Sequence, residues 1–305
     1  MSIASIENKL LEATVKLIEA AAVWLPEDVE NALIKAYEIE NVPATKSFLK
    51  AMIDNVKIAR EKRLPICQDT GVVMFHVAVG DKFPFTGLLP SILRKATVEA
   101  TMRIPLRPNT IDVFTGKNPG DNTGRYMPWI DWDFVEGSDT AEVTVLLKGG
   151  GSEVIGRAKN LIPAEGLKGV MKYVIEAVYE AGPQPCPPII VSVGIGPNVS
   201  TAMKLAYKGL LRPVGQRHEI PEVAKFEEEL LRAINDIGFG AHGMRGKVTA
   251  LDVHVDYAPR HPATLSVAVV INCWAARRAS MRIYPDGRVE YITHPYLNKE
   301  VVLHG

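Results

Sequence analysis

The sequence has few cysteines, no excess of charge of either sign and no long apolar run. Its three cysteines, Cys67, Cys186 and Cys273, are too few and too far apart for a disulfide framework, so we expect them to be reduced. The 35 basic side chains balance 35 acidic ones, which argues against a nucleic-acid partner because phosphate binding needs a local excess of lysine and arginine. The longest apolar runs, residues 187–193 and 265–271, are shorter than the roughly 18–20 residues that cross a bilayer, so we expect no membrane span.

The N-terminus also lacks a targeting signal, because residues 1–9 contain neither a basic region nor a signal-like apolar run. Together with the reduced cysteines, this predicts a cytoplasmic protein. The apolar fraction of 47% and the charged fraction of 23% are typical of soluble globular proteins, and 305 residues suffice for one large domain or two ordinary ones. No repeat, low-complexity stretch or linker forces a division, so we predict a single domain over residues 1–305.

The apolar periodicity predicts a mixed α/β (α+β) fold, with one or two central sheets surrounded by helices. Residues 5–62 have helical spacing, which predicts a helical N-terminal layer over residues 1–62 and a mixed core over 63–305. The apolar run at 72–79 predicts a buried strand. Further helices are predicted over residues 88–103, 166–181, 199–211 and 221–236, and further strands over 127–134, 141–147, 189–193, 249–257 and 264–272. Pro285-Asp286-Gly287-Arg288 predicts a hairpin turn between two final strands.

Three polar segments are candidates for chemistry. Residues 65–71 place a thiol, an amide, a carboxylate and a hydroxyl at consecutive positions just before the predicted strand at 72–79. Residues 105–128 are rich in Pro, Gly, Asn, Asp and Thr, and long loops of this kind in compact domains are usually functional or mobile. Residues 148–153 contain three consecutive glycines after a strand, whose backbone amides can converge on an anion.

The cysteines have no local metal-ligand spacing, and a single cysteine is more often a small buried apolar residue. Each of them, however, lies at the edge of a predicted strand in polar or proline-rich surroundings, and we expect residues 183–188 to hold Cys186 in a stiff extended loop. Three converging thiolates would be one ligand short of a closed zinc site or a fully ligated 4Fe-4S cube. An open iron could then act as a Lewis acid in the addition or removal of water.

Other residues leave alternatives open. Arg107 could bind a carboxylate through two of its guanidinium nitrogens, or it could be a surface cation. His261 could donate a proton, or it could simply be solvated. Gly194-Ile195-Gly196 lacks the third glycine of a dinucleotide-binding fingerprint, which favours a tight turn. Ser152-Glu153 has no evident histidine partner, so a hydrolase triad is unsupported.

Four motifs follow one another along the chain. They are Pro65-Ile66-Cys67-Gln68-Asp69-Thr70-Gly71, Lys148-Gly149-Gly150-Gly151-Ser152-Glu153, Cys186-Pro187-Pro188, and His261 ahead of Cys273-Trp274-Ala275-Ala276-Arg277-Arg278. In this order they resemble the alpha subunit of the two-subunit class I fumarases and L-tartrate dehydratases, and the similarity runs over nearly the whole chain. Two stretches depart from that family's pattern: Gly243-Met244-Arg245-Gly246, where a more glycine-rich run is expected, and Trp129-Ile130-Asp131-Trp132.

The resemblance implies an iron-sulfur hydro-lyase of the alpha type. By this resemblance Cys67, Cys186 and Cys273 hold a 4Fe-4S cluster whose fourth iron has no protein ligand. It also implies a set of contacts to a small dicarboxylate substrate, made by Gln68, Asp69, Arg107, the backbone amide of Gly150, and His261. Asp69 and His261 are expected to be the catalytic members, because they can orient or protonate a departing hydroxyl.

The resemblance further implies a separate beta subunit that supplies the residue removing the substrate proton. Since the chain stops at Gly305, about where the alpha part ends, we expect it to be incomplete without that subunit and to form an alpha homodimer within an alpha2-beta2 complex. The expected reaction is the oxygen-sensitive, reversible hydration of fumarate to malate. Dehydration of L-tartrate or another 2-hydroxydicarboxylate is the alternative. A non-catalytic scaffold or a structural zinc-binding subunit is the alternative of another class.

Overall fold

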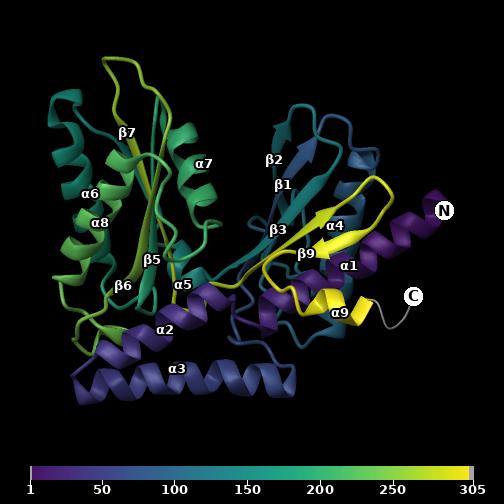
Figure 1. The fold of residues 1–305 in the computed structure, drawn as a ribbon, viewed down its shortest axis with the longest axis horizontal. Coiled ribbons are helices and arrows are strands. Elements are labelled where there is room, and N and C mark those ends of the chain that lie inside the picture. The colour runs from purple at the N-terminus through teal and green to yellow at the C-terminus, as the bar shows by residue number, and fades with distance from the viewer. Residues whose placement is uncertain (1, 302–305) are drawn as a thin grey trace. The chain divides into compact units, whose positions relative to one another are not determined.

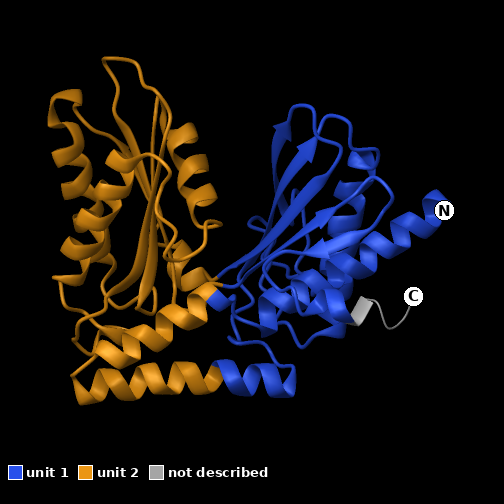
Figure 2. Ribbon diagram, viewed as in Figure 1, with its two compact units in different colours: residues 1–27, 56–148, 277–305 blue, residues 28–55, 149–276 orange. Residues whose placement is uncertain are grey.

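The structure, a computed structural model, describes residues 2–301 and divides into two compact units (Figure 2). Unit 1 comprises residues 1–27, 56–148 and 277–305, and unit 2 comprises residues 28–55 and 149–276. Each unit contains its own sheet. A division into compact units does not by itself define separate domains, so the single domain over residues 1–305 stays a prediction. Residues 1 and 302–305 of it lie outside the described range.

Residues 3–62 form three helices joined by short loops, as the helical spacing predicted. The helices are α1 (Ile3–Val23), α2 (Glu27–Ile39) and α3 (Pro43–Lys62). Ser2 caps α1, because its hydroxyl accepts the Ser5 N–H at 3.3 Å. The three helices are shared between the units, since α1 belongs to unit 1 and α2 to unit 2.

Unit 1 is built on a five-stranded sheet with the strand order β2-β1-β3-β8-β9. Its strands are β1 (Val72–Gly80), β2 (Trp129–Val135), β3 (Ala141–Lys148), β8 (Arg278–Ile283) and β9 (Val289–Tyr291). The β1–β2 pair is parallel and the other pairs are antiparallel. Helix α1 and helix α4 (Leu89–Arg103) pack against the sheet (Figure 1), and the short α9 (Leu297–Val301) follows β9. The predicted hairpin at residues 285–288 is confirmed.

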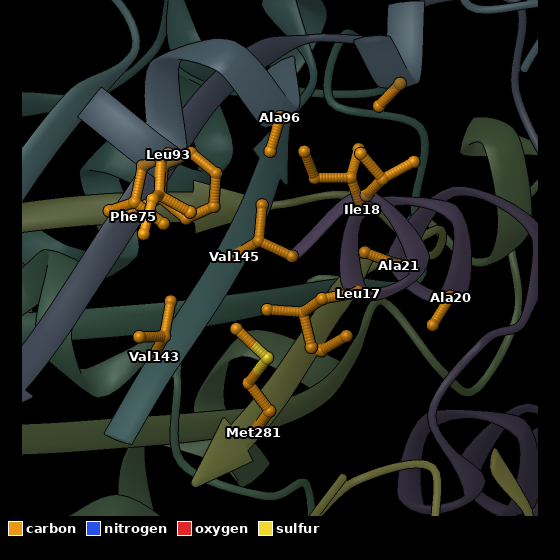
Figure 3. Packing of buried hydrophobic residues seen from close by; sticks show 14 of the residues in the cluster. Leu17, Ile18, Ala20, Ala21, Phe75, Leu93, Ala96, Val143, Val145 and Met281 are labelled. Carbon is orange, nitrogen blue, oxygen red and sulfur yellow. The ribbon is translucent and has the colours of Figure 1, made fainter. Parts of the chain in front are cut away.

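The core of unit 1 lies between the sheet and the helices α1 and α4 (Figure 3). Phe75 and Val77 of β1 are buried in the same cluster as Leu17 and Ile18 of α1. The intervening β1 residues, such as His76, are only half-buried, and His76 Nε2 lies 3.1 Å from an Asp133 carboxylate oxygen. The prediction of a buried strand is therefore correct for one face of β1 and wrong for the other, which is partly polar.

Unit 2 is built on a four-stranded sheet with the order β4-β7-β5-β6. Its strands are β4 (Arg157–Asn160), β5 (Ile189–Gly196), β6 (Ala250–Tyr257) and β7 (Ser266–Asn272). Helices α6 (Gly166–Ala181) and α8 (Pro221–Asn235) cover one face and α7 (Val199–Gly209) covers the other (Figure 1). Two sheets surrounded by helices confirm the predicted mixed α/β (α+β) fold. No helix in residues 2–301 is long and apolar enough to cross a membrane.

The Gly194-Ile195-Gly196 segment has a packing role. A Cβ atom on Gly194 would lie 1.9 Å from the carbonyl oxygen of Ala202, so the backbone of α7 rests directly on β5 at this point. Asn198 caps α7, because its side-chain oxygen accepts the Thr201 N–H at 2.8 Å. These two contacts explain the segment as a site of helix packing and capping, so a bound dinucleotide is not needed to explain it.

Candidate active site

Asp69 lies on the loop between α3 and β1 in unit 1, and its carboxylate is held by backbone and side-chain donors. The loop is anchored to α1 by a 2.9 Å hydrogen bond from the Ile66 N–H to the Ala22 carbonyl oxygen. Asp69 Oδ1 accepts the Gly71 N–H at 2.8 Å and Asn109 Nδ2 at 2.7 Å. Arg277 Nη1 donates to the Asp69 carbonyl oxygen. Cys67 is half-buried on the same loop, and Gln68 is exposed.

The long polar loop between α4 and β2 is ordered by an asparagine rather than by regular secondary structure. Within the described chain it contains no helix or named strand, as predicted. Asn122 is 1% exposed, and its Oδ1 accepts the Asn109 N–H at 2.7 Å. Its Nδ2 donates to Thr101 Oγ1 at 3.1 Å and to the Arg107 carbonyl oxygen at 3.3 Å. The exposed Arg107 side chain therefore extends from a fixed stretch of backbone.

Cys186 and Cys273 lie on neighbouring loops of unit 2. Cys273 directly follows β7, and Cys186 lies between α6 and β5. The Trp274 N–H donates to the Cys186 carbonyl oxygen at 3.4 Å. The predicted extended loop around Cys186 is wrong: Cys186 has a φ of 54°, and its N–H donates to the Pro183 carbonyl oxygen at 3.0 Å, which closes a tight turn.

The glycine-rich segment between α8 and β6 lies against the Cys186 turn. The His242 N–H donates to the Pro187 carbonyl oxygen at 2.9 Å, and the His242 ring lies 5.4 Å from the Phe48 ring. Burial lowers the pKa of His242. His242 and Arg245 have φ values of 50° and 64°, which L-residues rarely adopt. These two side chains were missed by the sequence reasoning, although the departure from a glycine-rich run at residues 243–246 pointed to the segment.

The second stretch that departs from the family's pattern, residues 129–132, has a role in packing. These residues begin β2, and the side chains of Ile130 and Trp132 pack against the core of unit 1. Trp129 is exposed.

Gly150 begins a single helical turn, α5 (Gly150–Glu153), after β3. The amides of Ser152 and Glu153 donate to the Gly149 carbonyl oxygen at 3.2 and 3.1 Å, which fixes the turn, and Gly150 is exposed at its start. Glu153 also accepts a hydrogen bond from the Tyr207 hydroxyl of α7. Burial, followed by this contact with Glu153, raises the pKa of Tyr207.

His261 lies on the exposed loop between β6 and β7. Its Nδ1 accepts the Ala263 N–H at 3.1 Å, so the neutral ring carries its proton on Nε2. The Thr264 N–H donates to the His261 carbonyl oxygen at 2.9 Å, which fixes the backbone of the loop. In this tautomer the Nε2–H can donate a hydrogen bond.

The three thiols suit an iron-sulfur cluster by their chemistry. None of the three forms a disulfide and all are half-buried, and thiolate is the ligand that such clusters use. Cys67 belongs to unit 1, whereas Cys186 and Cys273 belong to unit 2. Across the described part of the chain, no three His, Cys, Asp or Glu side chains are gathered as a metal site.

The chain thus has a mixed α/β fold and carries three half-buried thiols outside any disulfide, a carboxylate held by two N–H donors and an exposed arginine. The fumarate hydratase (Fumerase) family model matches residues 11–282. The L(+)-tartrate dehydratase subunit alpha of Escherichia coli K12 is 40% identical over 287 residues, covering 94% of this chain and 95% of that protein. The putative L(+)-tartrate dehydratase subunit alpha of Methanocaldococcus jannaschii is 42% identical over 284 residues, covering 92% of this chain and 100% of that protein. The chain therefore belongs to the fumarate hydratase family, and its enzyme class is that of the hydro-lyases. The resemblance inferred from the four motifs is confirmed.

Proposed function

We propose that the chain is the alpha subunit of a 4Fe-4S hydro-lyase that interconverts fumarate and malate. The observation that carries the proposal is the Asp69 carboxylate, held by two N–H donors in the unit that also presents Arg107. A fixed carboxylate and a guanidinium in the same unit suit proton exchange on a dicarboxylate. Dehydration of L(+)-tartrate is the second candidate, and it is favoured by the names of the relatives from E. coli and M. jannaschii.

We propose Cys67, Cys186 and Cys273 as the cluster ligands. They are the only cysteines of the sequence, and the support for this assignment is that all three are half-buried and none forms a disulfide. When bound, such a cluster supplies a Lewis-acidic iron for the substrate hydroxyl.

The remaining side chains have roles that follow from their chemistry. Arg107 and the Gly150 amide would neutralise the substrate carboxylates, and the exposed Gln68 amide would donate a hydrogen bond to one of them. Asp69 and the Nε2–H of His261 would orient the departing hydroxyl and give it a proton.

The proposed complex contains a second, beta subunit that supplies the proton-abstracting residue. The designation of the curated relatives as alpha subunits supports this partner. An alpha2-beta2 assembly in the cytoplasm completes the proposal.

The function is tested by assaying the alpha and beta subunits, co-expressed and purified without oxygen, against malate, fumarate and both tartrate enantiomers. The proposal expects the largest kcat/KM for malate and fumarate. Turnover of L(+)-tartrate with background activity on malate would establish the second candidate. Background rates on all four compounds, from a complex loaded with iron, would refute both.

A further inference from the structure

The Asp69 carboxylate has one oxygen that is saturated with hydrogen bonds. Oδ1 accepts two N–H groups, from Gly71 at 2.8 Å and from Asn109 at 2.7 Å. A carboxylate oxygen offers about two lone-pair directions, so two donors at these distances occupy both of them. A proton placed on Oδ1 would point at one of these N–H groups. Oδ1 is therefore an acceptor whether the carboxyl group is ionised or protonated.

The orientation of the Asn109 amide follows from the same contact. A carboxylate only accepts hydrogen bonds, so the atom of Asn109 that faces it at 2.7 Å is the NH2 group. The backbone of Asn109 is fixed in turn, because its N–H donates to Asn122 Oδ1 at 2.7 Å. Asn122 is buried with a φ of 60°, a conformation that asparagine tolerates better than most residues, and it bonds Thr101 of α4 at 3.1 Å. Asn109, which donates to Asp69, is thus connected through Asn122 to helix α4.

We propose that Asn109 is the residue that positions the Asp69 carboxylate. This inference rests on the proposed function, in which Asp69 orients the departing hydroxyl. The Asn109 Nδ2 donor at 2.7 Å and the Gly71 N–H at 2.8 Å together fix the orientation of the carboxylate, and of these two donors only Asn109 comes from a different loop.

The two asparagines make different kinetic predictions. The Asn109 side chain contacts Asp69, so its loss should lower kcat, because a displaced carboxylate no longer meets the departing hydroxyl. Asn122 also bonds the Arg107 carbonyl oxygen at 3.3 Å, so its loss should disturb both Asp69 and Arg107. Asn109→Leu, which is nearly isosteric but has no donor, should lower kcat about 10- to 100-fold with KM within about 3-fold. Asn122→Ala should lower kcat and raise KM together.

Asn118 offers a matched control in the same loop. Its Nδ2 donates at 2.9 Å to a backbone carbonyl oxygen, that of Pro108, and the residue is exposed. If the asparagines served only to stiffen the loop, Asn118→Ala would reduce kcat as much as Asn109→Leu does. We expect Asn118→Ala to stay within about 3-fold of the unsubstituted enzyme in both constants.

The kinetic experiment uses the anaerobic complex with its second subunit, and a crystal structure of Asn109→Leu supplies a readout independent of activity. We expect the Asp69 carboxylate to rotate away from its position beside Gly71. An unchanged kcat, an unmoved carboxylate, or an equal loss in Asn118→Ala would each overturn the inference. If the unsubstituted complex hydrates and dehydrates nothing, the proposed function fails on its own, and the orientation of Asp69 in the variant still decides whether Asn109 positions it.

Discussion

Replacement of Glu227 by glutamine should destabilise unit 2 severely. Glu227 of α8 is 0% exposed, and its carboxylate lies among hydrogen-bond donors. Oε1 accepts the Val255 N–H at 2.8 Å and a hydrogen bond from Arg212, and Oε2 accepts the His218 N–H at 3.0 Å. Arg217 Nη1 lies 3.6 Å from Oε2. The carboxylate thereby links α8 to strand β6 and to the loop before α8.

Glutamine has nearly the same shape, but its NH2 group would face one of these donors, and the half-buried guanidinium of Arg212 would lose its counter-charge. Removing one partner of a buried ion pair costs about 3–5 kcal/mol, a large part of the 5–15 kcal/mol that separates folded from unfolded domains. The neighbouring Glu228 is exposed on the same helix, so Glu228→Gln is the matched control, with an expected change below about 0.5 kcal/mol.

The measurement is the urea dependence of hydrogen exchange in peptides covering α8 and β6, which reports the free energy of opening in unit 2 itself. The reasoning would be refuted if Glu227→Gln lowered that free energy by no more than Glu228→Gln does.

Three further predictions concern the site and the packing. Arg107→Lys loses the planar two-nitrogen contact and should raise KM for the dicarboxylate about 10- to 100-fold with little change in kcat, measured by steady-state kinetics. Gly194→Ala, whose Cβ would lie 1.9 Å from the Ala202 carbonyl oxygen, should lower the free energy of unfolding by about 1–3 kcal/mol or more, whereas Gly87→Ala, with no atom within 4 Å of the added Cβ, should not. Burial raises the pKa of Tyr207, so the unfolded chain releases this proton near pH 10 while the folded chain keeps it. The stability of the folded protein should therefore fall above about pH 10, and less steeply in Tyr207→Phe, as followed by urea unfolding at several pH values.

The regular elements were accessible from the sequence because they depend on local periodicity. The helices within residues 5–62 and the hairpin at residues 285–288 follow from apolar spacing and turn chemistry, which act over a few residues. The sequence pattern did not distinguish the buried face of β1 from its half-buried face. Met74 and Ala78 are apolar by type, yet they lie on the half-buried face with His76.

The candidate active site could be predicted from the sequence only in part. The four motifs identified the family and the segments that carry the thiols, Asp69 and His261. The backbone turn at Cys186 was missed, because the flanking prolines restrict their own φ angles and leave that of Cys186 undetermined. Asn109 was missed because its partner Asp69 lies 40 positions away, and only the folded chain brings the two together.

The central claim is that Cys67, Cys186 and Cys273 hold a cluster for a hydro-lyase reaction. Its most direct test is the quantitation of iron and sulfide in the chain after anaerobic reconstitution, with Cys67→Ser, Cys186→Ser and Cys273→Ser measured beside it. We predict about four irons and four sulfides per unsubstituted chain, and a marked loss of both in each of the three variants. Stoichiometric zinc, no bound metal, or an iron content that is unaffected by the substitutions would contradict the account.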